Sequence, residues 1–177
     1  MITLAVTITL AFAGYVATYL NGLRLAQRQG RLARINSQLS DFYGPLLALA
    51  EANGRTFDAF VERHARPGGV SPFADKTPPT EHELAEWRLW VMSVFLPNIQ
   101  AMRDLVIQHA DLINESEMPP FLLQLAAHVS GYEVTVARWE AGSHDRHLSV
   151  ASYPHEVLAY AREGFSRLKR EQGRLLG

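Results

Sequence analysis

The chain has 177 residues, which is enough for one compact domain together with an N-terminal anchor. Its formal net charge of -1 argues against a protein that binds nucleic acid over its whole surface, so any electrostatic role must come from a local cluster. The absence of cysteine excludes disulfides, thiolate catalysis, iron–sulfur clusters and the usual structural zinc sites.

The N-terminal segment predicts a transmembrane helix. No charged side chain occurs from Met1 to Leu23, and about 20 apolar residues suffice to cross the hydrocarbon core of a bilayer. A cleaved signal peptide is the alternative, because Ala11-Phe12-Ala13 resembles a small-x-small cleavage site. That alternative needs a positively charged n-region and a longer apolar run before the cut, and both are missing. We therefore expect residues 1–23 to form a single membrane span.

Four basic residues follow this span directly: Arg24, Arg28, Arg31 and Arg34. By the positive-inside rule they place the C-terminal domain in the cytoplasm and the N-terminus outside. The bias toward arginine over lysine suggests a high-GC bacterial genome more than any mechanism. We expect the protein in the bacterial inner (cell) membrane. These arginines are also candidates for contact with anionic lipid headgroups. A topology signal alone is the simpler interpretation.

Small and polar residues share one face of the predicted span: Thr7, Ala11, Gly14, Thr18 and Asn21. Such a face allows close approach of helix backbones and interhelical hydrogen bonds, so it predicts a homo-oligomer. The same phase continues in a seam formed by Leu25, Arg28, Leu32, Ile35, Leu39, Phe42, Leu46 and Leu49. This seam suits a coiled coil or one long helix in a bundle, and after Leu39 we favour core packing within one protomer. A ring of subunits around a polar pore is a further alternative.

Pro45 lies inside an otherwise helical pattern. It removes a backbone hydrogen bond and crowds the carbonyl of Asp41, so it predicts a kink, or a break followed by a restart. We expect this point to separate a basic juxtamembrane stalk helix, residues 24–44, from a cytoplasmic helical bundle, residues 45–177. Residues 66–79 contain four prolines and predict a loop.

The remaining elements are also helical. Thr80 and Glu83 form a capping box that starts a helix, and Pro97 interrupts or ends it. Apolar faces predict three further helices, over residues 99–113, 121–139 and 155–176. No segment alternates with period two for long enough to predict a strand. The sequence thus predicts an all-α protein, in which one N-terminal transmembrane helix continues into a stalk and is followed by a four- to five-helix antiparallel bundle.

One group of residues has the composition of a catalytic site: Arg103, Asp104 and His109. An arginine, a polar residue and a histidine at this spacing resemble the active-site pattern of HEPN ribonucleases, which are all-helical. His109 could transfer a proton at a ribose 2′-hydroxyl while Arg103 stabilises charge on the phosphate. The pattern is permissive, however, and residues 138–144 repeat the spacing without a polar second residue. His109 also falls on the apolar side of its helix, so we favour a structural role.

Two other groups are weaker candidates for ligand binding. Five residues of metal-ligand type lie in or near the loop at 142–154: His144, Asp145, His147, His155 and Glu156. They lack the helical spacing of metal ligands, so we favour a solvated polar loop and predict no metal and no cofactor. Trp87 and Trp90 lie one turn apart and could form a ligand platform, but core packing is the commoner role.

Three motifs resemble a widespread group of uncharacterised bacterial membrane-anchored proteins: residues 39–46 (LSDFYGPL), 109–113 (HADLI) and 139–142 (WEAG). This resemblance implies a single-span helical protein and brings no function with it. The catalytic trio around Arg103 carries a second, weaker resemblance, to HEPN-like membrane accessory proteins of CRISPR and related defence systems. Those proteins have one N-terminal span and can form rings.

The sequence therefore favours a non-enzymatic, self-associating, membrane-anchored module that acts as a scaffold, sensor or regulator. Its expected partners are membrane lipids, other copies of the chain and a further protein. The alternative is a HEPN-like ribonuclease or a membrane-permeabilising accessory effector in bacterial antiviral defence. Only this alternative calls for RNA as a partner.

Overall fold

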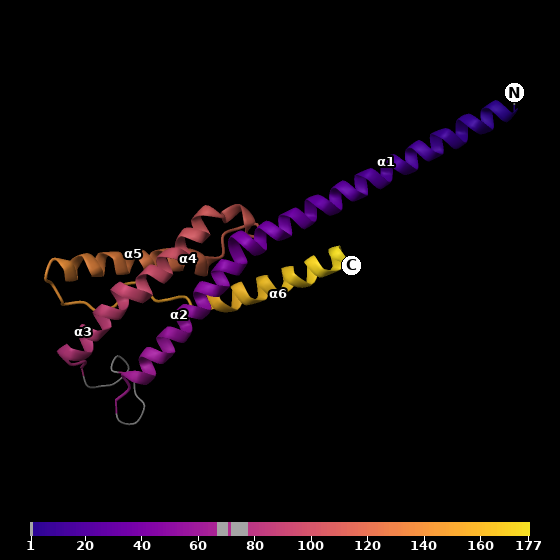
Figure 1. Cartoon of the computed structure of the whole chain (residues 1–177). Helices are drawn as coiled ribbons and strands as arrows, with labels where there is room; N and C mark the ends of the chain where they lie inside the picture. The colour runs from indigo at the N-terminus through magenta and orange to yellow at the C-terminus, as the bar shows by residue number, and fades with distance from the viewer. Residues whose placement is uncertain (1, 67–70, 72–77) are drawn as a thin grey trace.

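The computed structural model describes residues 2–66, 71 and 78–177, with side chains at residue 10 and from residue 12 onward within those ranges. The regular elements of this part of the chain are helices, and no strand occurs among them, which confirms the predicted all-α class. Figure 1 shows a bundle from which one long helix projects, with the N-terminus at its far end. The bundle consists of four helical rods, which agrees with the four to five that the sequence predicts.

The first rod contains α1 (Ile2–Ser37), the π-helical segment η1 (Gln38–Tyr43) and α2 (Gly44–Arg63). It changes direction at η1 without leaving the helix (Figure 1), so the bend expected before Pro45 is present and a break is not. The Gly44 N–H donates to the Leu39 carbonyl, five residues back. This wider turn accommodates the proline ring that would crowd the Asp41 carbonyl in an ordinary α-helix.

The second rod repeats this arrangement. It contains α3 (Glu81–Trp90), the π-helical η2 (Val91–Phe95) and α4 (Leu96–Gln108), followed by the short η3 (Ala110–Leu112). The Leu96 N–H donates to the Val91 carbonyl, and Pro97 follows at once. Pro97 therefore bends the rod without ending it, and the helix expected from residue 99 is part of a longer one that ends at Gln108.

The predicted capping box at the start of α3 is confirmed. The Thr80 side chain accepts a hydrogen bond from the Glu83 N–H at 3.3 Å, and the Glu83 carboxylate accepts one from the Thr80 N–H at 2.6 Å. Arg66 donates to the same carboxylate, at 2.9 Å from Nε and 2.7 Å from Nη2. These hydrogen bonds lower the pKa of Glu83 to about 2, and the hydrogen bond from Arg66 has the largest effect. The box therefore joins the end of the first rod to the beginning of the second.

The third rod is α5 (Pro120–Glu140) and the fourth is α6 (Glu156–Leu176). Their connection, residues 141–155, runs back along α5 and is called the strap below. The Trp139 ring N–H donates to the Arg146 carbonyl at 2.7 Å, and the Ser149 hydroxyl donates to the His128 carbonyl at 2.9 Å. Gly131 of α5 allows this close approach, because an added Cβ would collide with the Ser149 hydroxyl. The polar loop expected here is thus fastened to α5 along its length.

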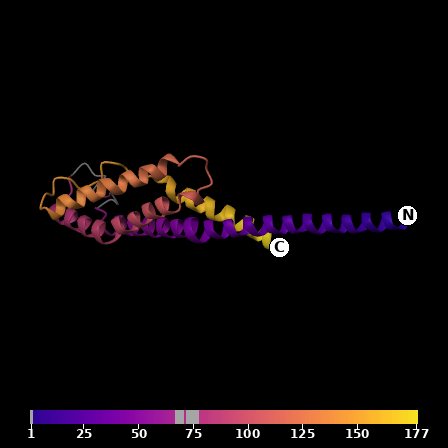
Figure 2. The same ribbon diagram turned by 90° about the horizontal axis from the view of Figure 1, so that it is seen from above.

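Consecutive rods run in opposite directions, and their apolar faces meet in one core (Figures 1 and 2). Fully buried side chains come from every rod: Phe42, Tyr43, Leu46, Met102, Leu122, Leu125, Val129 and Val157. The core begins at Ile35, so the segment 35–43, expected in the stalk, belongs to the bundle and buries Ile35, Gln38, Leu39, Phe42 and Tyr43 in it. The part of the seam after Leu32 is therefore core of the same chain, as favoured from the sequence for its last residues.

The fourth rod lies along the first in the opposite direction. Gly164 of α6 packs directly on Tyr43, and its missing side chain leaves room for the tyrosine ring. The Tyr43 and Tyr160 hydroxyls lie 2.9 Å apart in a hydrogen bond one turn away. Figure 2 shows α6 reaching back beside the projecting helix, with the C-terminus next to α1.

None of the helices in the described part of the chain has the length and apolarity required to cross a membrane. Met1 and the side chains of residues 2–9 and 11, on which the predicted span depends in part, lie outside that description.

Replacing Gly164 by alanine should destabilise the bundle by about 1–3 kcal/mol, because the added methyl group must displace the buried Tyr43 ring. Gly173→Ala is the matched control in the same helix, since an added Cβ there meets nothing within 4 Å. It should stabilise the helix by roughly 0.5–1 kcal/mol. Denaturant unfolding of the full chain in mild detergent, followed by circular dichroism, measures both. Equal stability of the two variants would contradict this packing.

His128 should make the bundle less stable in mild acid. Its Nδ1 lies 2.6 Å from the Ala151 carbonyl of the strap, and burial lowers the pKa of His128 below its ordinary value of 6.5. Because the unfolded chain then binds the proton more readily, the stabilisation is complete above pH 6.5 and declines as the pH falls through that value. In His128→Asn, whose amide can donate to the same carbonyl without titrating, unfolding free energies should depend less on pH. An unchanged slope between wild type and variant would refute this assignment.

Candidate functional site

The most unusual surface of the molecule is the projecting part of α1. Large apolar side chains are exposed around the whole circumference of this helix: Leu10, Phe12, Tyr15, Tyr19, Leu20, Leu23 and Leu25. Leu10 and Tyr15 are 68% and 69% exposed. Exposed apolar side chains that lie close together are typical of a surface that another molecule covers. The bundle leaves these side chains uncovered.

Three of the residues predicted to form an oligomerisation face lie in this exposed stretch. Gly14, Thr18 and Asn21 are exposed, and a Cβ added at Gly14 would meet nothing within 4 Å. The Thr18 hydroxyl donates to the Gly14 carbonyl at 2.9 Å within the same helix. The other two members, Thr7 and Ala11, have side chains outside the described residues. The described part of this face is thus free of intramolecular packing.

The arginines predicted to contact lipid headgroups make tertiary contacts that the sequence did not indicate. The Arg28 guanidinium donates to the Leu175 carbonyl, with Nε at 2.9 Å, and Arg31 Nε donates to the Glu171 carboxylate at 2.6 Å. Arg34 donates to the Asp111 carbonyl at 3.1 Å. Three of the four arginines therefore fasten α1 to the end of α6 and to η3. Arg24, one turn nearer the projecting segment, is exposed.

The facing half of α6 is also basic. Arg167, Lys169, Arg170 and Arg174 are exposed there. Sequence reasoning missed these residues, although four basic residues among eight was a usable signal. Between this half of α6 and α1 lies a cavity of about 180 Å³, lined by Arg31, Arg34, Ile35, Gln38, Asn114, Arg167, Leu168 and Glu171. Basic side chains of two distant chain segments thus gather on one end of the bundle.

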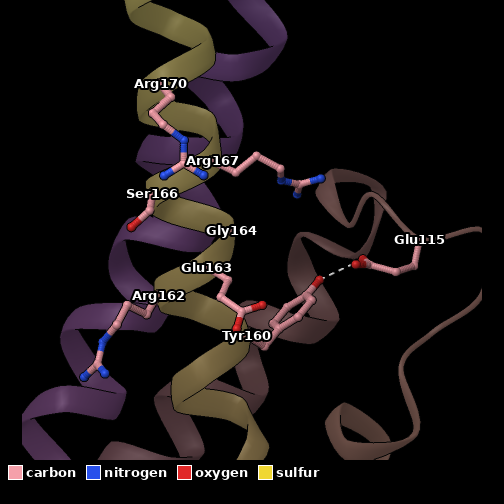
Figure 3. A pocket seen from close by; sticks show the side chains of 8 residues that line it. All are labelled: Glu115, Tyr160, Arg162, Glu163, Gly164, Ser166, Arg167 and Arg170. Atoms are coloured by element: carbon pink, nitrogen blue, oxygen red, sulfur yellow. Dashed lines mark hydrogen bonds between the residues drawn. The ribbon is translucent and has the colours of Figure 1, made fainter.

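A larger open hollow of about 610 Å³ follows α6 toward the middle of the bundle (Figure 3). Its lining consists of Glu115, Tyr160, Arg162, Glu163, Gly164, Ser166, Arg167 and Arg170. The Tyr160 hydroxyl donates to the Glu115 carboxylate at 2.9 Å, and burial raises the pKa of Tyr160. The arginines in Figure 3 point in different directions, and Arg162 pairs with Glu51 of α2. The hollow does not gather its charges around one ligand.

The structure brings only two members of the predicted catalytic trio together. Arg103 donates to Asp104 at 3.0 Å and to Glu133 of α5 at 2.6 Å. The hydrogen bond that Arg103 donates to Glu133 is the main cause of the raised pKa of Arg103. His109 lies just past the end of α4, and no hydrogen bond or ion pair joins its ring to either residue in the described structure. The guanidinium is thus neutralised by two carboxylates and tied to α5.

The remaining predicted ligand groups are not assembled. No set of three or more His, Asp or Glu side chains in the described ranges is placed to hold a metal ion. Trp87, with 5% of its surface exposed, packs against Phe60 and Phe95 at ring-centroid distances of 5.5 Å and 5.7 Å. Trp90 packs on the same two phenylalanines. These tryptophans are parts of an aromatic core cluster and do not form an open platform.

Comparison with known proteins adds no family to these observations. No protein-family model, no curated protein and no solved structure matches the chain. A functional assignment must therefore be argued from the residues and their geometry.

Proposed function

We propose that the chain is a single-span membrane protein that self-associates through its span and presents its helical bundle to a protein partner at the cytoplasmic face of the bacterial inner membrane. In this role it is a scaffold, sensor or regulator and not an enzyme. The observation that carries the proposal is the projecting apolar part of α1, which the bundle leaves uncovered.

The sequence of this segment supports the proposed span, although several of its side chains lie outside the described residues. Residues 2–23 contain no charged side chain, and as a helix they extend roughly 33 Å, against a hydrocarbon thickness of about 30 Å. The bundle core begins only at Ile35 and is complete without them. Arg24 and Arg28 then mark the cytoplasmic boundary of the span.

The structure narrows the surface available for self-association. Ile35, Leu39, Phe42 and Leu46, which continue the predicted seam, are buried in the bundle of their own chain. The small and polar face that precedes the seam is not buried in this way. Its described members Gly14, Thr18 and Asn21 are exposed, and their side chains suit close packing of helices within a bilayer.

The contacts of the catalytic trio support a non-enzymatic role. Arg103 is held by Glu133 and Asp104, so placing a substrate phosphate there would first require breaking two ion pairs. His109 has no contact that would orient its ring as an acid or base toward Arg103. A HEPN-like ribonuclease is therefore less well supported than a binding module.

A charge inside the span should prevent insertion. Ala13→Arg places an arginine near the middle of the segment, which costs about 2.5–3.5 kcal/mol of insertion free energy, whereas Ala26→Arg, beyond Leu23, should have no effect. We expect the wild type and Ala26→Arg to stay in the membrane pellet after alkaline carbonate extraction, and Ala13→Arg to be released. Recovery of the wild type in the supernatant would refute the span.

A bulky residue on the proposed packing face should weaken self-association. Gly14→Leu should raise the dissociation constant of the oligomer in detergent by about fivefold, equivalent to roughly 1 kcal/mol, by preventing close backbone approach. Ala13→Leu adds the same type of side chain away from that face and serves as the control. Mass photometry reports the distribution of species. A monomeric wild type, or equal effects of both substitutions, would contradict the proposed face.

A further inference from the structure

Many of the basic residues of the chain are concentrated in two short segments. Residues 24–34 and 167–174 together contain eight of the 17 basic residues and only one of the 18 acidic residues, Glu171. Glu171 is itself paired with Arg31. The rest of the chain is consequently acidic, although the total charge is close to zero.

The two basic segments meet because α6 runs antiparallel to the first rod. Arg162 of α6 pairs with Glu51, Gln172 donates to Asn36 at 2.7 Å, and the Leu175 carbonyl accepts from Arg28. The C-terminal end of α6 is therefore the part of this helix nearest to the projecting segment of α1. Figures 1 and 2 both show the end of α6 beside α1.

The hydrogen bond between Arg28 and the Leu175 carbonyl sets how far the end of α6 lies from a membrane that contains residues 2–23. Arg28 follows Leu23 by five residues, or roughly 8 Å along the helix axis. The interfacial layer of a bilayer extends about 5–8 Å beyond the hydrocarbon on each side. The last turn of α6, held against Arg28, therefore lies at the level of the lipid headgroups, and Leu176 there is 66% exposed.

Arg174 lies in the turn at this level, and Arg170 and Arg167 lie one and two turns farther from the hydrocarbon, by roughly 6 and 10 Å along the helix axis. All three share one side of the helix and are exposed. None of the three forms an ion pair within the described part of the chain, and Lys169 donates only to the Gln172 side chain. An anionic surface attracts each such residue by about 1 kcal/mol.

We propose that the C-terminal half of α6 binds the anionic lipid surface of the same bilayer in which α1 is anchored. This inference rests on the proposed membrane span. The bundle then has two attachments to the membrane, the span and the Arg167, Arg170 and Arg174 stripe, which together restrict its tilt.

The test uses the full chain in nanodiscs, either of phosphatidylcholine alone or with added phosphatidylglycerol. Because the chain contains no cysteine, Gly173→Cys supplies a single labelling site, and an added Cβ there meets nothing within 4 Å. A fluorophore at this site should be quenched by headgroup spin-labelled lipid more strongly in the anionic discs than in the neutral ones, because binding of the arginines restricts the tilt of the bundle. Raising the salt concentration to about 1 M, where the Debye length is roughly 3 Å, should reduce the quenching to that seen in neutral discs.

A triple substitution, Arg167→Gln with Arg170→Gln and Arg174→Gln, should lower the ratio of docked to undocked bundles at least about tenfold. The control removes three arginines from the far end of the bundle, at Arg55, Arg63 and Arg138, and should leave quenching unchanged. Equal quenching in neutral and anionic discs, or equal quenching in the two triple variants, would overturn the inference.

A second label separates this inference from the span on which it rests. A fluorophore at Ala13→Cys should be quenched by lipids that carry a spin label on the acyl chain. Quenching at Ala13 without any at Gly173 overturns the α6 inference alone. Absence of quenching at Ala13 overturns the proposed span and the α6 inference together.

Discussion

The close approach of Gly164 to the Tyr43 ring sets the register between α6 and the long N-terminal rod. A side chain at this point would separate the two helices, and the hydrogen bonds on either side of it depend on their spacing. With this register, Arg162 meets Glu51 on one side, and Leu175 meets Arg28 on the other. The basic half of α6 therefore comes to lie beside the basic segment of α1, although more than 130 residues separate them in sequence.

Local sequence signals identified the helical elements, and long-range packing determined how they join. The Thr80 and Glu83 box and the apolar periodicity of α5 and α6 act within one or two turns, so they can be recognised from neighbouring residues. Pro45 and Pro97 show only that a backbone donor is missing. Whether the chain breaks or forms a π turn depends on burial of the preceding residues, such as Phe42 and Phe95, against other rods.

The candidate sites also combine local signals with contacts that only the fold creates. The uncharged N-terminal segment and the arginines after it can be recognised from the sequence, because length and position along one helix define them. The tertiary contacts of those arginines are not visible, since Arg31 and Arg34 find partners in Glu171 and Asp111 through the fold. The spacing of Arg103, Asp104 and His109 suggests a catalytic site that the fold does not assemble. Sequence spacing does not reveal that Glu133, on another helix, accepts a hydrogen bond from the Arg103 guanidinium.

The π turn at η1 also has a consequence for the coupling between the two ends of the first rod. Because α1, η1 and α2 form one uninterrupted helical rod, the direction in which Gly14 and Asn21 face around the helix axis is fixed relative to that of Phe42 and Leu46 in the core. One residue corresponds to about 100° of helical rotation. Deleting a residue to regularise η1 would therefore turn the two faces out of phase. A rotation of α1 about its own axis would, in the same way, be transmitted to the bundle as torque, because no hinge separates the two.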